Sequence, residues 1–494
     1  MSKIAFINPS VDKYSEIRTW SSDLINYMNG RSMTVMPRLT AMTLAALTPA
    51  KHSFTYIDEE IEDIVFDKID ADIIAITAMT IQARRAYEIA GEFRKRGATV
   101  IMGGIHASVL PDEAGQYADA ICIGEGENVW PAMLEDFEAG VLKSRYDAKD
   151  YPPVTALVSP RTDIFDPSHY FVYPVITSKG CPYNCEFCSI RFSSGHKIRL
   201  KPVAQVVEEI KALEKLNGKI YKKTYQFVDD NLYANREHAI ELFTAVKDLH
   251  ISWSGQGSLD TAMDDEVVRL MAEAGCQNFS IGFESLSEDS LKEANKTVAN
   301  QVEKYKSAVQ NLTRYGIVPE GFFICGFDSD DKSVFKTIVD FVMEANLINP
   351  YINILTPYPG TRLYKRVEHR LCDNNWSHYG IRSVFTPAKM TSRELETGLC
   401  WAYSVTMDLE TVKKQLVKFW SNGPWKSNPA LTLKERLILL FIGFQLYLNK
   451  NFREYSGFLF WAATRRKAAT LFVLIQALHF ADMTKRFISR YSVL

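Results

Sequence analysis

The chain has 494 residues, of which 47% are hydrophobic, and its formal net charge is −2 at pH 7. This length corresponds to about three domains at roughly 150 residues each, with ample apolar material for their cores. A nearly balanced charge gives no reason to expect a nucleic-acid partner. Because no signal peptide is recognisable, we expect a cytoplasmic enzyme whose isolated cysteines are reduced and mostly buried.

Residues 1–145 alternate between short apolar strands and amphipathic helices. The strands are predicted at 3–9, 53–57, 71–77, 99–104 and 120–124, and the helices at 39–47 and 82–96. Continuous apolar strands separated by helices are typical of a parallel, doubly wound, Rossmann-like sheet. Such a sheet binds its ligands beyond the carboxyl ends of its strands.

The loops at those carboxyl ends contain the candidate ligand-binding residues of the first domain. They include the sequences Gly-Gly-Ile-His and Gly-Glu-Gly-Glu. The candidates are Asn8, Thr77, Thr80, Gly103, Gly104, His106, Gly124, Glu125 and Gly126. Glycines that follow strands are also ordinary turn residues, so a purely structural domain is the alternative.

Residues 171–365 follow a linker at 146–170 and contain six strand–helix repeats. The strands are predicted at 174–177, 224–230, 251–257, 278–284, 318–327 and 351–356, each followed by a helix except the last. Six such repeats predict a partial (β/α)6 barrel. Its active site is expected at the carboxyl ends of the strands.

Three cysteines, Cys181, Cys185 and Cys188, follow the first strand of this barrel with the spacing C-x3-C-x2-C. Thiolates this close can bind a four-iron cluster and leave one iron open to another ligand. Zinc usually takes four ligands, often as two C-x2-C pairs, and the sequence has no second pair. A disulfide is disfavoured because the thiols are odd in number.

The cysteine motif resembles the signature of the radical S-adenosylmethionine (SAM) enzymes. The phrases GGIHAS and GEGE and the order of the elements resemble the cobalamin-binding domain that precedes the barrel in one large subgroup. The resemblance implies a [4Fe–4S] cluster on the three cysteines, with SAM on its fourth iron. It also implies cobalamin bound without a histidine ligand, because the usual Asp-x-His-x-x-Gly loop is absent, or else a domain that has lost this cofactor.

The same resemblance implies where SAM is bound in the barrel. Asp229 and Asp230 end the second strand, where the family contacts the SAM amino group, usually through Gly-Gly-Glu. Ser258 follows the third strand and Glu284 ends the fourth, where the family places ribose and carboxylate contacts. Phe187 holds the position of an aromatic residue that stacks on adenine. For each of them, a polar cap or simple packing is the alternative.

Residues 366–494 have a different character, with several aromatic residues and few strand signals. The last stretch, 431–494, is helical in pattern and has ten Lys or Arg against three Asp or Glu. Its apolar run 437–448 is too short to cross a bilayer, which takes ~20 residues. A helical bundle that packs on the barrel is favoured, and a peripheral membrane contact is the alternative.

The resemblance implies a cobalamin-dependent C-methyltransferase. One SAM supplies a methyl group through cobalamin, and a second supplies the 5′-deoxyadenosyl radical that takes hydrogen from an unactivated carbon. A cyclase, oxidase or ring-rearranging enzyme with the same cofactors is the alternative, and a non-catalytic regulator would leave the barrel acids without a use. We expect a lipid, isoprenoid or tetrapyrrole substrate, and an electron donor such as flavodoxin or ferredoxin.

Overall fold

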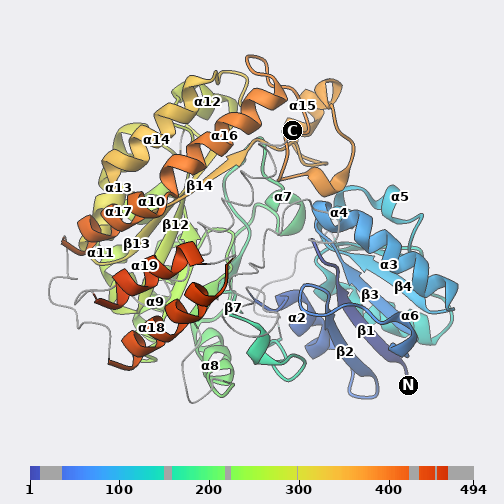
Figure 1. The fold of residues 1–494 in the computed structure, drawn as a ribbon. Coiled ribbons are helices and arrows are strands. Elements are labelled where there is room, and N and C mark those ends of the chain that lie inside the picture. The colour runs from blue at the N-terminus through green and yellow to red at the C-terminus, as the bar shows by residue number, and fades with distance from the viewer. Residues whose placement is uncertain are drawn as a thin grey trace.

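The computed structural model describes residues 1–11, 36–148, 158–216, 224–297, 299–421, 433–450 and 453–464. Two parallel sheets of six strands dominate the fold. They lie side by side, with the segment around the short helix α7 (Ile190–Ser193) between them (Figure 1). No helix in these ranges is both long and apolar enough to cross a membrane.

The first sheet has the strand order β2-β1-β3-β4-β5-β6, and every pair in it is parallel. Its strands are β1 (Lys3–Asn8), β2 (Ser53–Asp58), β3 (Ile73–Thr77), β4 (Thr99–Gly103), β5 (Ala120–Gly124) and β6 (Arg145–Ala148). The sequence predicts all of them except β6. This edge strand alternates exposed and buried residues over only four positions, so it has no apolar run.

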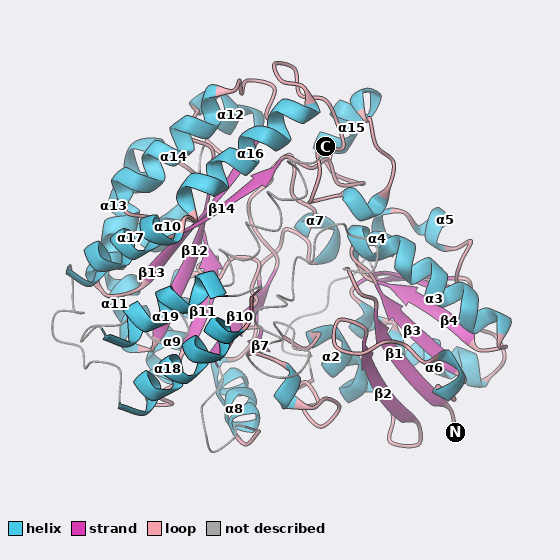
Figure 2. Cartoon of the chain, in the orientation of Figure 1, coloured by secondary structure: helices cyan, strands magenta, loops and turns pink. Residues whose placement is uncertain are grey.

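Helices cover both faces of the first sheet (Figure 2). The helices are α2 (Leu39–Leu47), α3 (Ala83–Lys95), α4 (Ile105–Val109), α5 (Pro111–Ala114) and α6 (Trp130–Glu138). Successive strand residues point to opposite faces, so Ile4 and Phe6 pack against α2 and α6, whereas Ala5 and Ile7 pack on the side of α3. This two-layered core confirms the doubly wound fold.

The second sheet has the order β14-β13-β12-β11-β10-β7, also with parallel pairs only. Its strands are β7 (Val172–Val175), β10 (Thr224–Phe227), β11 (Trp253–Gly257), β12 (Cys276–Glu284), β13 (Val318–Cys325) and β14 (Asn349–Ile354). The helices around it are α8 (Val203–Glu214), α9 (Arg236–Lys247), α10 (Leu259–Met263), α11 (Asp265–Glu273), α12 (Glu288–Glu293), α13 (Tyr305–Arg314) and α14 (Ser333–Ala345). Strand order equal to chain order, with helices outside, is the partial barrel that the sequence predicts.

One predicted helix of the barrel begins later than expected. The sequence pattern suggests a helix over 298–315, whereas α13 starts at Tyr305 after a short 3-10 turn at Val302–Lys304. The Asn300 side chain donates hydrogen bonds to the carbonyl oxygens of Gly282 and Phe283, at 2.8 and 2.7 Å. These bonds hold the segment before α13 against the end of β12 as a loop.

The C-terminal region is helical as predicted, through α16 (Ser392–Thr406), α17 (Leu409–Ser421), α18 (Leu433–Leu448) and α19 (Arg453–Thr464). Helix α16 packs on α14 and β14. Helices α17, α18 and α19 share an apolar cluster with Val318 and Ile348, at the amino ends of β13 and β14. They therefore close the end of the barrel opposite to the strand carboxyl ends. The predicted helical stretch at 465–494 lies outside the described residues.

Candidate active site

The three cysteines lie in a long hairpin loop at the carboxyl end of β7. Strands β8 (Ser178–Lys179) and β9 (Arg199–Leu200) pair antiparallel and form its base. Gly180 begins the loop with φ +92°, and a Cβ there would lie 2.4 Å from the Lys197 carbonyl oxygen. Only glycine fits this turn. The hairpin therefore positions the first cysteine, Cys181, directly after a fixed backbone bend.

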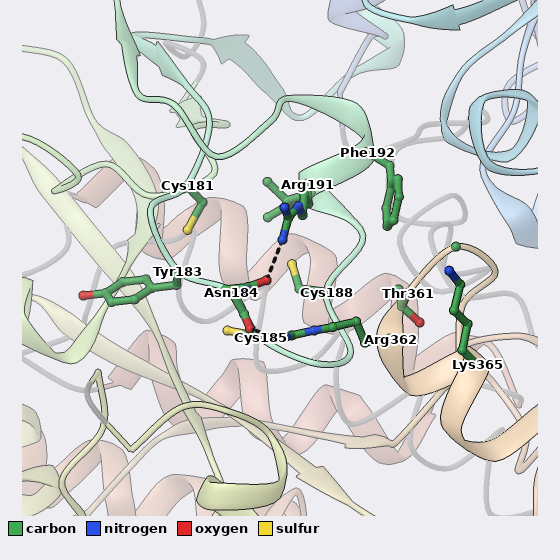
Figure 3. Close-up of a pocket in the computed structure, with 12 residues that line it drawn as sticks. Cys181, Tyr183, Asn184, Cys185, Cys188, Arg191, Phe192, Thr361, Arg362 and Lys365 are labelled. Atoms are coloured by element: carbon green, nitrogen blue, oxygen red, sulfur yellow. Dashed lines mark hydrogen bonds between the residues drawn. The ribbon is translucent and has the colours of Figure 1, made fainter. Parts of the chain in front are cut away.

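The thiols of Cys181, Cys185 and Cys188 line one pocket, together with Tyr183 and the segment after β14 that contains Thr361. Figure 3 shows their sulfur atoms around a common space. All three are free thiols. Among the described residues, no three Cys, His, Asp or Glu side chains close around a single ion position.

Burial raises the pKa of the Cys185 and Cys188 thiols, to about 11 and about 12. The Lys296 ammonium acts in the opposite direction on all three thiols. Thiolates are the form that binds iron, so a buried cation near them favours the binding-competent state.

Lys296 itself is paired with Glu284 at the end of β12. Its Nζ lies 2.7 Å from Glu284 Oε1, and both side chains are only 10% exposed. Burial lowers the pKa of Lys296, but Glu284 and the cysteine thiolates outweigh it, so the pKa is raised. Glu284 has φ +63°, and a Cβ on Gly282 would lie 2.4 Å from its Oε1. The backbone here is shaped to place this ion pair beside the cluster pocket.

Asp229 and Asp230 hold the base of the cysteine hairpin. Asp229 is fully buried, and its Oδ1 accepts hydrogen bonds from the Thr177 hydroxyl at 2.7 Å and the Ser178 hydroxyl at 2.6 Å. Burial raises the pKa of Asp229 to about 6, although these donors oppose the rise. Asp230 Oδ2 accepts from the Gly180 amide at 2.9 Å. The structure thus gives both acids partners within the hairpin.

The two other candidates of the barrel have ordinary local environments. Ser258 is buried and lies at the amino end of α10. Phe187 is partly buried and packs on an apolar cluster that includes Ala294 and Leu363. Packing therefore accounts for Phe187 without a ligand. Its predicted stacking on adenine stays a prediction.

The carboxyl edge of the first sheet is built from small residues and from side chains that bond to one another. Gly104 has φ +90°, and a Cβ there would lie 2.8 Å from the Ala78 backbone and from the Thr77 hydroxyl. Asn8 donates to Asp58 Oδ1 at 2.7 Å and accepts from Arg38 Nε at 2.9 Å. The other candidates in these two loops are partly or fully buried, namely Thr80 and Gly103.

His106 faces a neighbouring network rather than this edge. It is fully buried, and its Nε2 lies 2.8 Å from the Tyr87 hydroxyl. Tyr87 and Trp376 both donate to Glu113 Oε1, each at 2.9 Å. Trp376 belongs to the segment after the barrel, so the network joins that segment to the first domain. This network holds the His106 side chain inside the protein, and its predicted contact with a cofactor stays a prediction.

The Gly-Glu-Gly-Glu loop is in contact with the cysteine hairpin. Arg199 donates to both carboxylate oxygens of Glu125, at 2.6 and 2.8 Å, and both side chains are buried. Lys179 lies opposite Arg199 in the hairpin and pairs with Glu127 at 2.6 Å. Burial raises the pKa of Glu127, but Lys179 and Arg199 outweigh it and the pKa is lowered. These ion pairs fix the first domain against the hairpin.

The glycines of this loop, Gly124 and Gly126, differ in how much room they have. Gly124 has φ +84°, and a Cβ there would lie 2.9 Å from the Ala148 carbonyl oxygen. A Cβ on Gly126 would make only ordinary contacts, at 3.6 Å or more. Gly124 is therefore required by the close approach of β6, the strand for which the sequence has no signal.

The predicted SAM-binding residues of the barrel lie around the cysteine hairpin. The predicted cobalamin-binding residues of the first domain lie in the loops at the carboxyl edge of its sheet. Sequence reasoning missed the partners that connect them, namely Lys179, Arg199, Glu127 and Lys296. Lys179 and Arg199 could have been found as cations at the two ends of the cysteine segment. Lys296 has no such signal, because it lies 12 positions after Glu284 in a loop.

Two family models match the chain, each over one of these parts. The B12 binding domain matches residues 32–134, and the radical SAM superfamily matches residues 175–342. Two similar curated proteins come from Chlorobaculum tepidum. Bacteriochlorophyllide d C-8(2)-methyltransferase is 34% identical over 352 residues, which are 68% of this chain and 77% of that protein. Bacteriochlorophyllide d C-12(1)-methyltransferase is 31% identical over 364 residues, which are 72% and 79%.

Solved structures share the fold along the whole chain. The cobalamin-dependent S-adenosylmethionine radical enzyme OxsB, with aqua-cobalamin bound, matches with a TM-score of 0.65 at 14% identity, covering 100% of this chain and 81% of OxsB. TsrM from Kitasatospora setae matches with a TM-score of 0.61 at 14% identity and covers 100% of both chains. With the cysteine hairpin between the two sheets, the chain belongs to the cobalamin-dependent radical SAM enzymes, which use a [4Fe–4S] cluster, SAM and cobalamin.

Proposed function

We propose that this protein transfers a methyl group to an unactivated carbon of a tetrapyrrole. The observation that carries the substrate class is the similarity, at 34% and 31% identity, to two enzymes that methylate bacteriochlorophyllide d. A hopanoid C-2 methylase from Rhodopseudomonas palustris is more distant, at 25% identity. A polycyclic, mostly apolar acceptor is common to both groups of relatives.

The cluster site is assigned to Cys181, Cys185 and Cys188, which the hairpin holds around one pocket. When bound, the cluster and SAM supply a 5′-deoxyadenosyl radical, and cobalamin supplies the methyl group. Asp229 and Asp230 keep the base of the hairpin in place through Ser178 and Gly180.

Glu284 and Lys296 supply a buried pair of opposite charges beside the cluster pocket. A pair of this kind suits the amino and carboxylate groups of SAM, because charge-assisted hydrogen bonds are the strong ones. Ser258, at the amino end of α10, completes this proposed SAM surface. Phe187 shields the cluster from the side of its apolar neighbours.

Cobalamin is assigned to the edge formed by Asn8, Thr77, Thr80 and the two glycine-containing loops. The support for this assignment is that the edge is closely built, since a Cβ at Gly104 or Gly124 would collide with the backbone of a neighbouring segment. His52 and His106 are both buried, and each has a hydrogen-bond partner within the protein. We therefore propose that neither of these two imidazoles binds cobalt.

One relative supports cyclisation as a second candidate reaction. An anaerobic magnesium-protoporphyrin IX monomethyl ester cyclase from Rubrivivax gelatinosus is 24% identical over 431 residues, which are 80% of this chain. A cyclase would use the same cofactors without transferring a methyl group. The higher identity of the methyltransferases favours methylation.

The experiment is an anaerobic assay of the cluster-reconstituted protein with cobalamin, a reductant, bacteriochlorophyllide d and SAM that has a deuterated methyl group. We expect labelled methyl in the tetrapyrrole, with 5′-deoxyadenosine and S-adenosylhomocysteine in equal amounts. An altered tetrapyrrole without label, and 5′-deoxyadenosine without S-adenosylhomocysteine, would establish the cyclase or oxidase class instead. Label found in a hopanoid but not in the tetrapyrrole would refute the substrate class.

The same proposal includes the supply of electrons and the location of the enzyme. A reduced cluster needs a low-potential donor, for which flavodoxin or ferredoxin is the proposed class. An apolar acceptor is concentrated at membranes, so we place the enzyme in the cytoplasm with a peripheral membrane contact.

A further inference from the structure

Helix α18 exposes a row of large apolar side chains. Leu437, Phe441, Phe444 and Leu448 are 55–62% exposed and recur at intervals of three or four residues, which places them on one face. Leu440 and Tyr447 extend the same face. The other exposed large apolar residues of the described chain are scattered singly over different elements. Contiguous exposed apolar surface marks an interaction site.

The exposed face is not needed for the core of the helical cluster. The opposite side of α18 buries Leu439 and Leu446 against α19, where Phe458 and Leu459 are buried as well. This inner contact satisfies the packing of the helix pair. The outer apolar row therefore exists for a partner outside the cluster.

The sequence around the apolar row is basic. Between residues 433 and 464 the sequence has four Lys or Arg and two Glu. Arg453 follows the end of α18, where its guanidinium lies 5.2 Å from the Tyr447 ring and its Nε donates to the Tyr447 carbonyl. An apolar helix face with a basic rim is the pattern of helices that lie in the interface of an anionic bilayer.

Charge also distinguishes three possible partners of the exposed α18 face, namely a membrane, a second copy of the chain, and residues 465–494. A two-fold contact with a second copy would bring the basic rim against itself. Residues 465–494 have six Lys or Arg against one Asp, so they have the same sign as the rim. Anionic lipid is the only one of the three with opposite charge.

We propose that the outer face of α18 docks this protein on an anionic lipid surface. The row is too short to span a bilayer, so the contact is peripheral. The helix cluster lies at the amino ends of β13 and β14, away from the cysteine hairpin. Docking therefore leaves the active-site end of the barrel free. This inference does not depend on the proposed substrate.

The test is co-sedimentation of the full-length, cluster-reconstituted protein with vesicles of phosphatidylcholine, with and without phosphatidylglycerol. We expect binding to the anionic vesicles, weakened by high salt, and a loss of at least about tenfold in partitioning for the double variant Phe441→Ser/Phe444→Ser. The matched control Val65→Ser/Val141→Ser removes two exposed apolar residues of the first domain and should bind like the wild type.

Iron content, SAM cleavage and thermal midpoint should be the same in all three proteins, because the row is outside the core. No binding of the wild type, or equal binding of the α18 variant, overturns the proposal. A wild-type dimer in light scattering that dissociates in the α18 variant, without lipid binding, assigns the face to a second copy. A lowered thermal midpoint without lipid binding assigns it to another segment of the chain.

Discussion

The two sheets of this protein present their carboxyl edges to the same hairpin, but they are built differently. The edge of the first sheet consists of glycines, threonine and side chains that bond to one another, such as Asn8 and Asp58. The edge of the barrel has thiols and a buried ion pair, Glu284 with Lys296. Shape dominates the first edge, and charge and reactivity dominate the second.

This difference indicates how each edge should fail. A site formed by shape fails when a side chain adds bulk, whereas a site formed by reactive groups fails when a group is removed. The ion pairs between Glu125 and Arg199 and between Glu127 and Lys179 are the part that belongs to both edges. Changing these ion pairs should uncouple methyl transfer from SAM cleavage without abolishing either reaction.

Removing one thiol should abolish the chemistry of the barrel edge. In Cys185→Ala the cluster loses one of three thiolates, so we expect little bound iron and a fall in 5′-deoxyadenosine formation of at least about a thousandfold. Cobalamin binding should persist. Iron analysis and product chromatography after reconstitution measure both. Cys372→Ala, which removes an exposed thiol, is the control and should keep its cluster.

Adding one methyl group should damage the edge of the first sheet. Gly104 has φ +90° and ψ −178°, a region that costs other residues of order 1–3 kcal/mol, and its Cβ would also collide with Ala78. We expect Gly104→Ala to lose cobalamin and to reduce methyl transfer at least about tenfold, with SAM cleavage retained. Gly97→Ala is the control, since Gly97 has φ +82° but open space around its Cβ. Equal cobalamin content in both variants would contradict a site at this edge.

Breaking the buried contact between the edges should uncouple them. In Arg199→Met, Lys179 at 3.7 Å stays as the cation that pairs with Glu125 among the described residues. Loss of one partner of a buried pair costs up to roughly 3–5 kcal/mol, and the remaining cation reduces this. We expect cluster and cobalamin to bind, but methyl product per 5′-deoxyadenosine to fall roughly fivefold. Arg199→Lys should restore part of the ratio. Arg94→Met, in an exposed pair with Asp119, should leave it unchanged.

The strands of the first sheet and the cysteine site could be predicted from the sequence, because both depend on local patterns of residues. Apolar runs, two of which end in glycine, located five strands of the first sheet, and the cysteine spacing indicated the pocket where the cluster is proposed. The strand β6 could not be found, since an edge strand that buries every second residue has no apolar run. Fold class and cofactors are therefore the parts that were predicted best.

The contacts between domains could not be predicted, because they join residues far apart in the chain. The sequence suggested Glu125 and His106 as candidates for cofactor binding. In the structure, Glu125 pairs with Arg199, 74 positions later, and His106 lies in a network that reaches Trp376. A polar residue in a ligand-binding loop has the same local pattern whether it faces a ligand or another domain. Only the tertiary arrangement separates the two.

Replacing Asp229 at the base of the hairpin should have the smallest effect on turnover. Its expected effect is on the pH dependence of the stability. Burial raises its pKa from the ordinary value of 3.8 to about 6, so the folded protein binds this proton more tightly than the unfolded chain. Stability from Asp229 is then fully present below about pH 4 and is lost as the pH rises to about 6. For the wild type, this loss is on the order of 2–3 kcal/mol.

In Asp229→Asn that part of the pH dependence should be absent, while the hydrogen bonds from Ser178 and Thr177 can still reach the amide oxygen. Chemical unfolding of both proteins between pH 4 and 7, before the cluster is loaded, measures the difference. We expect the wild type to lose stability relative to the variant over this range. Parallel pH profiles would mean that Asp229 is hydrated in the folded protein. The hairpin base would then be open to solvent, and Asp229 would be free to contact the SAM ammonium, as the family resemblance implies.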